Sequence, residues 1–179
     1  MRHAAFFRNL NLGRTHAPNR TQFEAAFHDA GSDFAASFLT NGTMVFEAAD
    51  ATDAQALVER AIARLVAVCG LREPALVRDL PYLARLVASD PFADVDRATV
   101  YDCYATFMSP QVLIGADTPH RNAKGDVEVL RYTAGEALTL ARQFGASPGS
   151  PNAFIEKQFG LPATTRAWNT VVRLVAKFA

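Results

Sequence analysis

The sequence predicts an α+β protein whose first half has the ferredoxin-like order β-α-β-β-α-β. Its second half is a smaller α+β part with a β-hairpin and terminal helices. Three observations predict this class: a short apolar run at residues 4–7, an Asn-Gly pair at 41–42 between two strand-like runs, and a long amphipathic pattern over residues 54–66. We place the boundary after the fourth strand, which divides the chain into residues 1–79 and 80–179.

The first strand is expected at residues 4–7, followed by a loop that contains Pro18. A helix should begin at the segment 21–24, because Thr21 and Glu24 have the spacing of a capping box, in which each side chain accepts from a free backbone N–H. Apolar residues at helical spacing continue this helix to Ala30, and Gly31 ends it.

Two strand-like runs at residues 34–39 and 44–46 surround Asn41-Gly42. This dipeptide favours the positive φ angles of a two-residue hairpin turn. The apolar residues of the segment 54–66 then recur at i, i+3 and i+4, which predicts a helix of several turns that ends near Gly70. A strand at residues 74–78 completes the first half.

In the second half, Asp79 can cap a helix that carries Leu80 and Leu83. We then expect strands at residues 99–108, at 112–114 and in a hairpin of 127–132 with 137–141. A short helix over 152–159 should be closed by Gly160. A final helix is predicted from Thr164 onward, with Trp168, Val171, Val172, Val175 and Phe178 on one face.

Composition excludes several function classes. The 179 residues are 50% hydrophobic, and 18 basic residues balance 18 acidic ones, so no global charge marks a nucleic-acid or membrane protein. No apolar run approaches the ~20 residues that span a bilayer. The apolar run near the N-terminus is also too short for a signal peptide, so we expect a cytoplasmic protein. Cys69 and Cys103 are expected to be reduced.

Motifs for specific chemistry are missing from the sequence. The histidines His3, His16, His28 and His120 do not have metal-ligand spacing on one element, and neither a nucleophile-elbow nor a phosphate-loop motif is present. No metal and no cofactor is therefore predicted. The oligomeric state is not indicated.

The charges are unevenly distributed along the chain. Residues 1–23 and 157–179 each contain four basic residues and no acid, so the two ends together carry +8, and the middle carries −8. A fold that brings the ends together would create one basic face. The alternative is two solvated ends with no shared role.

Several segments resemble a family. These are residues 5–13, 38–46, the pair Pro91-Phe92, 152–157 and 160–171. Together they resemble the bacterial family catalogued as domain of unknown function 1697, over nearly the whole chain. The resemblance implies a two-part α+β fold and no established activity. The chain departs from the family pattern at Asn9 and Arg14, which stand at usual glycines, and at Thr43, which stands at a usual asparagine.

The topology places the matching segments at one rim. The first and third strands of a ferredoxin-like sheet are antiparallel neighbours, so the end of the first strand should lie beside Asn41. Arg8 and Arg14, with N–H groups at the start of the helix near Thr21, could bind an anion there. We therefore predict a non-catalytic module for a small anionic or phosphate-bearing ligand. Its candidate binding residues are Arg8, Asn9, Asn11, Gly13, Asn41, Arg166 and Asn169.

Other interpretations stay open. The glycines can simply be turn residues, and Arg8 can pair with an acid at the edge of the core. The rim could instead belong to an enzyme of unknown reaction. The segment 152–178 also resembles a helix-turn-helix, whose second helix would project Arg166, Asn169 and Arg173 toward nucleic acid. The isoelectric point of about 6.9 argues against this last alternative.

Overall fold

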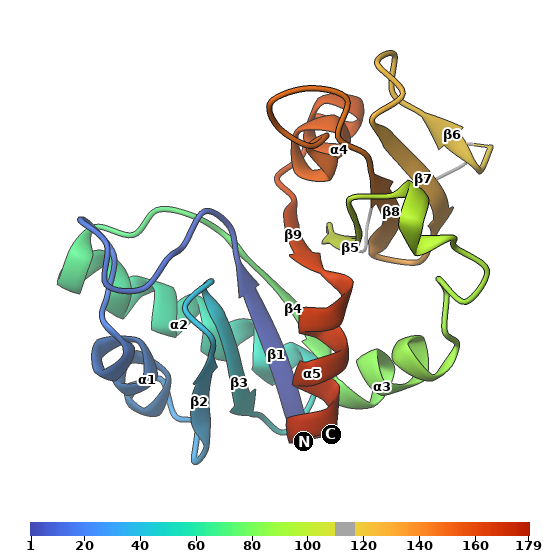
Figure 1. The fold of residues 1–179 in the computed structure, drawn as a ribbon. Coiled ribbons are helices and arrows are strands. Elements are labelled where there is room, and N and C mark those ends of the chain that lie inside the picture. The colour runs from blue at the N-terminus through green and yellow to red at the C-terminus, as the bar shows by residue number, and fades with distance from the viewer. Residues whose placement is uncertain (110–116) are drawn as a thin grey trace. The chain divides into compact units, whose positions relative to one another are not determined.

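The computed structural model describes residues 1–109 and 117–179 and divides the chain into two compact units. Unit 1 comprises Met1–Arg85 together with Leu174–Ala179, and unit 2 comprises Leu86–Arg173. The sequence predicted a division after residue 79. The structure instead keeps the first part of the following helix in unit 1 and adds the C-terminal residues to it (Figure 1).

Unit 1 contains the elements in the predicted order. They are β1 (Arg2–Phe7), α1 (Arg20–Asp29), β2 (Ala35–Phe38), β3 (Thr43–Glu47), α2 (Ala51–Cys69) and β4 (Ala75–Asp79). The strands form a sheet of order β2-β3-β1-β4, in which every neighbouring pair is antiparallel. The predicted pairing of the first and third strands is therefore confirmed. The name ferredoxin-like stays an interpretation of this topology.

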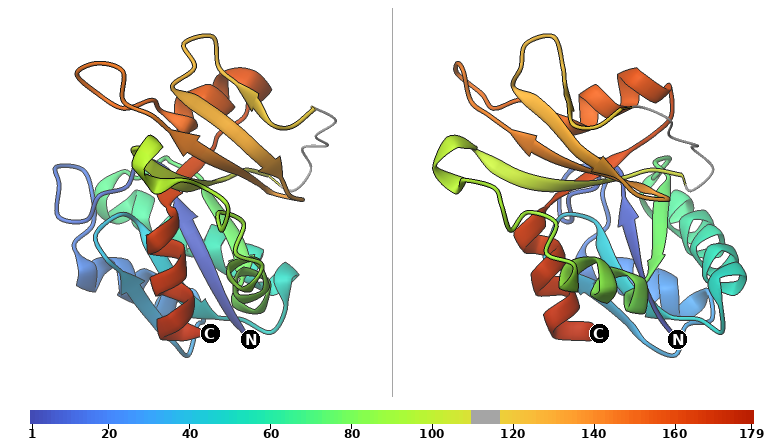
Figure 2. Two further views of the ribbon diagram at one scale, coloured as in Figure 1. Left: turned by 45° about the vertical axis from the view of Figure 1, so that its right-hand side comes forward. Right: turned by 90° about the vertical axis from the view of Figure 1, so that its right-hand side faces the viewer.

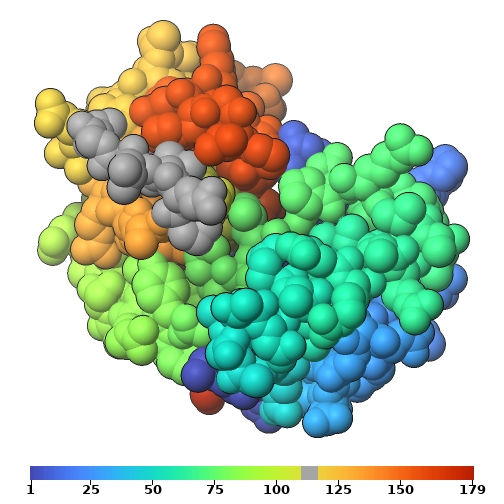
Figure 3. Space-filling model, turned by 180° about the vertical axis from the view of Figure 1, so that it is seen from behind, coloured from blue at the N-terminus to red at the C-terminus, as the bar shows by residue number. Residues whose placement is uncertain are grey.

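The two faces of this sheet are covered differently. α1 and α2 pack on one face (Figure 1). Phe7, Phe23 and Phe27 are fully buried there, and their rings meet edge to face. α2 also spreads over the surface of unit 1, in blue-green (Figure 3). On the other face, the ring of Phe178 near the C-terminus lies 6.3 Å from that of Phe34 and 6.0 Å from that of Phe38. Aromatic contacts therefore hold the last residues against the sheet.

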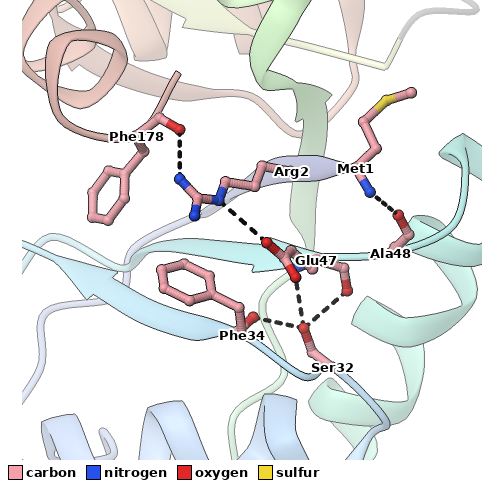
Figure 4. A network of polar contacts seen from close by, with 7 residues as sticks. All are labelled: Met1, Arg2, Ser32, Phe34, Glu47, Ala48 and Phe178. Atoms are coloured by element: carbon pink, nitrogen blue, oxygen red, sulfur yellow. Dashed lines mark hydrogen bonds and ion pairs between the residues drawn. The ribbon is translucent and has the colours of Figure 1, made fainter.

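Arg2 secures the same C-terminal segment through polar contacts (Figure 4). Its Nη1 donates to the Phe178 carbonyl at 3.1 Å, and its Nε donates to the Glu47 carboxylate at 3.3 Å. Beneath it, the Ser32 hydroxyl donates to the Phe34 carbonyl at 2.6 Å. Strand β1 is thus tied to β3 and to the chain end at one edge of the unit.

Two local predictions in unit 1 were wrong in detail. Helix α1 begins at Arg20 with Asn19 as its N-cap, so the capping box is formed by Asn19 and Gln22 and not by Thr21 and Glu24. The hairpin between β2 and β3 is present, but its loop has the four residues 39–42, because Phe38 pairs with Thr43. Positive φ occurs at Gly42, as predicted, and also at Leu39.

Unit 2 contains a second antiparallel sheet. Its elements, after the helix α3 (Leu80–Ala88) that connects the two units, are the 3-10 turn η1 (Arg97–Thr99), β5 (Asp102–Phe107), β6 (His120–Arg121), β7 (Val127–Tyr132), β8 (Glu136–Ala141), α4 (Pro151–Phe159) and β9 (Thr164–Ala167). The strand order is β6-β7-β8-β5-β9. α4 covers one face of this sheet (Figure 2).

Several predictions in the second half are confirmed. Asp79 Oδ1 accepts from the Tyr82 N–H at 2.6 Å and so caps α3. The hairpin of β7 with β8 is present, and Gly160 closes α4 with a φ of 65°. The strand predicted at residues 112–114 lies outside the described residues.

The final helix does not begin at Thr164. Residues Thr164–Ala167 form β9, which pairs with β5, and α5 (Trp168–Phe178) follows at once. Two adjacent threonines suit a strand, because β-branched side chains pack well on a pleated sheet. Trp168 is buried, as predicted, with its ring 5.2 Å from that of Phe92.

No helix among the residues that the structure describes is both long enough and apolar enough to span a membrane.

Candidate anion-binding site

The candidate site lies at the rim where β1 ends. The backbone N–H of Phe7 donates to the Gly42 carbonyl at 2.8 Å, and that of Leu12 donates to the Thr40 carbonyl at 2.8 Å. On the other side, the Arg8 N–H donates to the Pro74 carbonyl at 3.0 Å. The loop that follows β1 is therefore bonded both to the hairpin loop 39–42 and to the segment before β4. The predicted shared rim is confirmed.

Left-handed residues shape this loop. Asn9 has a φ of 50°, Gly13 of 76° and His16 of 61°, and asparagine and glycine are the residues that tolerate this conformation best. The Gly13 N–H donates to the Pro18 carbonyl at 3.0 Å and closes the loop on itself. Asn9, Asn11 and His16 are exposed in this loop.

A pocket of about 340 Å³ lies between this loop and the end of α2. It is lined by residues 9–11, 14–17 and 70–73. Its charged lining groups are Arg14, Arg72 and Glu73. Because all of these residues belong to unit 1, the pocket is built within one compact unit.

The acid in this pocket is already engaged. Glu73 Oε2 forms an ion pair with Arg8 Nη1 at 2.7 Å, and its Oε1 accepts from the Asn9 amide at 3.5 Å. Arg14 and Arg72 are both exposed, and neither forms an ion pair with any residue in the described part of the chain. The pocket therefore presents two guanidinium groups to solvent, whereas its carboxylate is neutralised.

Comparisons with known proteins identify the family. The model of the family described as Protein of unknown function (DUF1697) matches residues 1–137, which is more than half of the chain. The chain belongs to this family. The resemblance found in the sequence is thereby confirmed over residues 1–137, and the family description assigns no activity.

A solved structure has a similar fold. A conserved bacterial protein from Streptococcus pneumoniae matches with a TM-score of 0.62 over 98% of this chain and 97% of that chain, at 15% sequence identity. Identity this low shows likeness of fold alone, which agrees with the predicted α+β class. No curated protein matched this DUF1697 protein.

The structure brings together only part of the predicted ligand-binding set. Asn9 and Asn11 line the pocket. Arg8 lies beside it and pairs with Glu73, which is the alternative that the sequence left open. Gly13 and Asn41 lie in the adjoining turns, where the Asn41 side chain accepts from the Thr43 hydroxyl at 2.9 Å.

Three backbone N–H groups at the start of α1 are already hydrogen-bonded. Asn19 Oδ1 accepts from the Gln22 N–H at 2.9 Å, and the Asn19 N–H donates to the Gln22 side chain at 2.9 Å. The Phe23 N–H donates to the Asn19 carbonyl at 3.0 Å. These three N–H groups are thus bonded within the first turn, and the polar side chains that line the pocket include Arg14, Arg72 and Asn11.

The two remaining predicted residues, Arg166 and Asn169, belong to unit 2 of the DUF1697 protein. Arg166 lies in β9, is buried, and donates to the Thr164 hydroxyl at 2.8 Å and to the Thr165 carbonyl at 3.0 Å. Burial lowers the pKa of Arg166 to about 10. Asn169 is exposed on α5. The helix-turn-helix alternative placed Arg166 on a second helix, and this placement is wrong because Arg166 lies in strand β9.

Sequence reasoning missed Arg72 and Glu73. A signal was available, since β4 is antiparallel to β1 and its start must lie beside the end of β1. The predicted topology already contained that relationship.

The residues that the structure describes contain no group of three or more His, Cys, Asp or Glu side chains able to hold a metal ion.

Proposed function

We propose that this DUF1697 protein is a non-catalytic module that binds a small phosphate-bearing anion in the pocket beside β1. The proposal rests on which charged side chains of this pocket are engaged in ion pairs and which are not. Glu73 is neutralised by Arg8, whereas Arg14 and Arg72 face the pocket without ion pairs among the described residues.

Two arginines suit a phosphate group. Guanidinium groups donate in a planar fork that matches phosphate oxygens, and two of them match the double charge of a phosphate monoester. The Asn11 side chain lines the same pocket and can supply an uncharged donor. A volume of about 340 Å³ suits a metabolite and not a macromolecule.

Binding can be tested with calorimetry and thermal melts on the whole chain. The ligands are inorganic phosphate and a panel of phosphate monoesters, with their unphosphorylated parents as controls. The variants are Arg14→Ala and Arg72→Ala. Arg64→Ala is the matched control, because Arg64 is exposed on α2 and does not line the pocket.

We expect at least one phosphorylated compound to raise the stability of the parent by about 2.7 kcal/mol at a hundredfold excess over its dissociation constant. Arg14→Ala and Arg72→Ala should lose most of this gain, and Arg64→Ala should keep it. A gain that persists in both pocket variants would contradict the proposal, as would the lack of any response to phosphate compounds.

The alternatives give different results in the same screen. An enzyme at this rim would convert a bound compound, which analysis of the mixture by mass spectrometry detects. Nucleic-acid binding would appear as affinity for a short duplex that falls steeply with salt.

A cytoplasmic location belongs to the same proposal, and the two free thiols Cys69 and Cys103 fit a reducing compartment.

A further inference from the structure

Unit 2 contains a larger cavity of about 690 Å³. One wall is the turn between β6 and β7 at residues 122–126. The other is a single face of α4, whose lining residues are Ser150, Ala153, Phe154, Lys157 and Gln158. This spacing of three and four residues is that of one helical face. Its volume lies in the range of small-molecule sites.

Two side-chain acceptors that line this cavity are already engaged. The Asp126 carboxylate accepts from the Asn122 amide at 2.7 Å and pairs with Lys124 Nζ at 2.7 Å. The Ser150 hydroxyl oxygen accepts from the Ala153 N–H at 3.3 Å. These contacts hold the cavity walls in place and neutralise Asp126, the one acid among the described residues that line the cavity.

Two side chains of α4 offer donors to the same cavity. Gln158 Oε1 accepts from the Tyr132 hydroxyl at 3.2 Å, which orients the amide and leaves its NH₂ group available. Lys157 is exposed and forms no ion pair with the described residues. A ligand would therefore meet one ammonium and one amide donor on adjacent positions of α4.

Apolar surface lies next to these donors. Phe154, Ala123 and Ala153 line the cavity, and the methylene stem of Lys157 adds to them. We propose that this cavity is a second binding site, separate from the pocket beside β1, and that it takes a small carboxylic acid with an apolar body. The carboxylate binds Lys157 and the Gln158 amide, and the body packs on Phe154. One cation without an ion pair among the described residues matches a singly charged acid, whereas the pocket beside β1 offers the two arginines Arg14 and Arg72.

The test uses the full chain labelled with ¹⁵N and amide resonances as the readout. The probes are 3-phenylpropionate, its neutral amide and inorganic phosphate. Lys157→Gln removes the cation. Ala153→Trp fills the cavity from an exposed helical position without removing a bonded group. Arg131→Gln is the matched control, because Arg131 is an exposed cation on β7 that does not line the cavity.

We expect 3-phenylpropionate to shift the resonances of residues 122–126 and 150–158 in a saturable way. The neutral amide, and the acid with Lys157→Gln, should each bind about tenfold more weakly, because a charge-assisted hydrogen bond is lost. Ala153→Trp should abolish the shifts while the dispersed spectrum persists, and Arg131→Gln should change nothing.

Three results would overturn this site. The first is the lack of saturable shifts in these residues at millimolar 3-phenylpropionate. The second is equal affinity of the acid for the parent and Lys157→Gln. The third is a response confined to residues 9–17 and 70–73, which would place binding of the acid in the pocket beside β1. A response of that pocket to phosphate alone bears on the proposed function and not on this site.

Discussion

Gly42 lies against Leu10 so closely that a β-carbon at position 42 would stand 2.7 Å from the Leu10 Cβ and 2.9 Å from its carbonyl oxygen. This approach joins the hairpin loop to the loop after β1, which carries the candidate site. The contact also explains why glycine occupies a turn whose φ is +67°.

Gly42→Ala should destabilise unit 1 through two effects. A left-handed alanine is strained by about 1–3 kcal/mol. The clash with Leu10 adds a further ~1–3 kcal/mol. Gly13→Ala is the matched control, because Gly13 has a φ of +76° but nothing within 4 Å of an added β-carbon. Denaturant unfolding of both variants measures the difference. Equal losses would show that the Leu10 contact costs nothing.

Trp168→Ala should lower the free energy of unfolding by roughly 3–5 kcal/mol, because the indole is buried and packs edge to face on Phe92. Trp168→Phe keeps an aromatic ring and should lose less. Since Trp168 is the single tryptophan of the chain, the emission of the protein directly reports the environment of this side chain. An emission maximum typical of water in the folded protein would contradict the burial.

Burial lowers the pKa of His3 below its ordinary value of 6.5, with the N-terminal ammonium adding to the effect. The imidazole is buried beside Phe46, and no described residue bonds to its Nε2. The unfolded chain therefore binds the proton more readily. Stability should fall as the pH drops below about 6.5, by at most ~1.4 kcal/mol per pH unit for this group.

His3→Leu should reduce this loss of stability on acidification. Denaturant unfolding of the parent and the variant between about pH 7 and pH 5 measures the difference in slope. Parallel pH profiles for the two proteins would show that His3 does not titrate in this range.

Glu73→Gln should tighten anion binding in the pocket beside β1. The substitution removes the one acid of the lining and releases Arg8 from its ion pair. The pair is partly exposed, so its loss should lower stability by no more than about 1 kcal/mol. Calorimetry with the best phosphate compound of the screen measures the affinity. Weaker binding would indicate that Glu73 itself contacts the ligand.

Local sequence patterns predicted most of the secondary structure. The segment 54–66 has strict helical periodicity and a glycine stop, and α2 ends at Gly70 as expected. The rim formed by the loop after β1 and the hairpin could also be predicted, since strand order follows from the order of elements. The choice between Asn19 and Thr21 as N-cap could not, because both residue types cap well and have a glutamine or glutamate three residues later.

The sequence by itself determined the α+β class, the family and the paired loops at the end of β1, because turn residues and hydrophobic periodicity act over a few neighbours. Tertiary structure decided the rest. Residues 164–167 became a strand because β5 offered them a pairing edge, which buries Arg166 inside unit 2. Tertiary structure also decided that Arg72 lines the same pocket as Arg14, because strand order alone places β4 beside β1 but does not say which side chains line one cavity. Both outcomes depend on contacts between segments distant in the chain, and no local pattern contains that information.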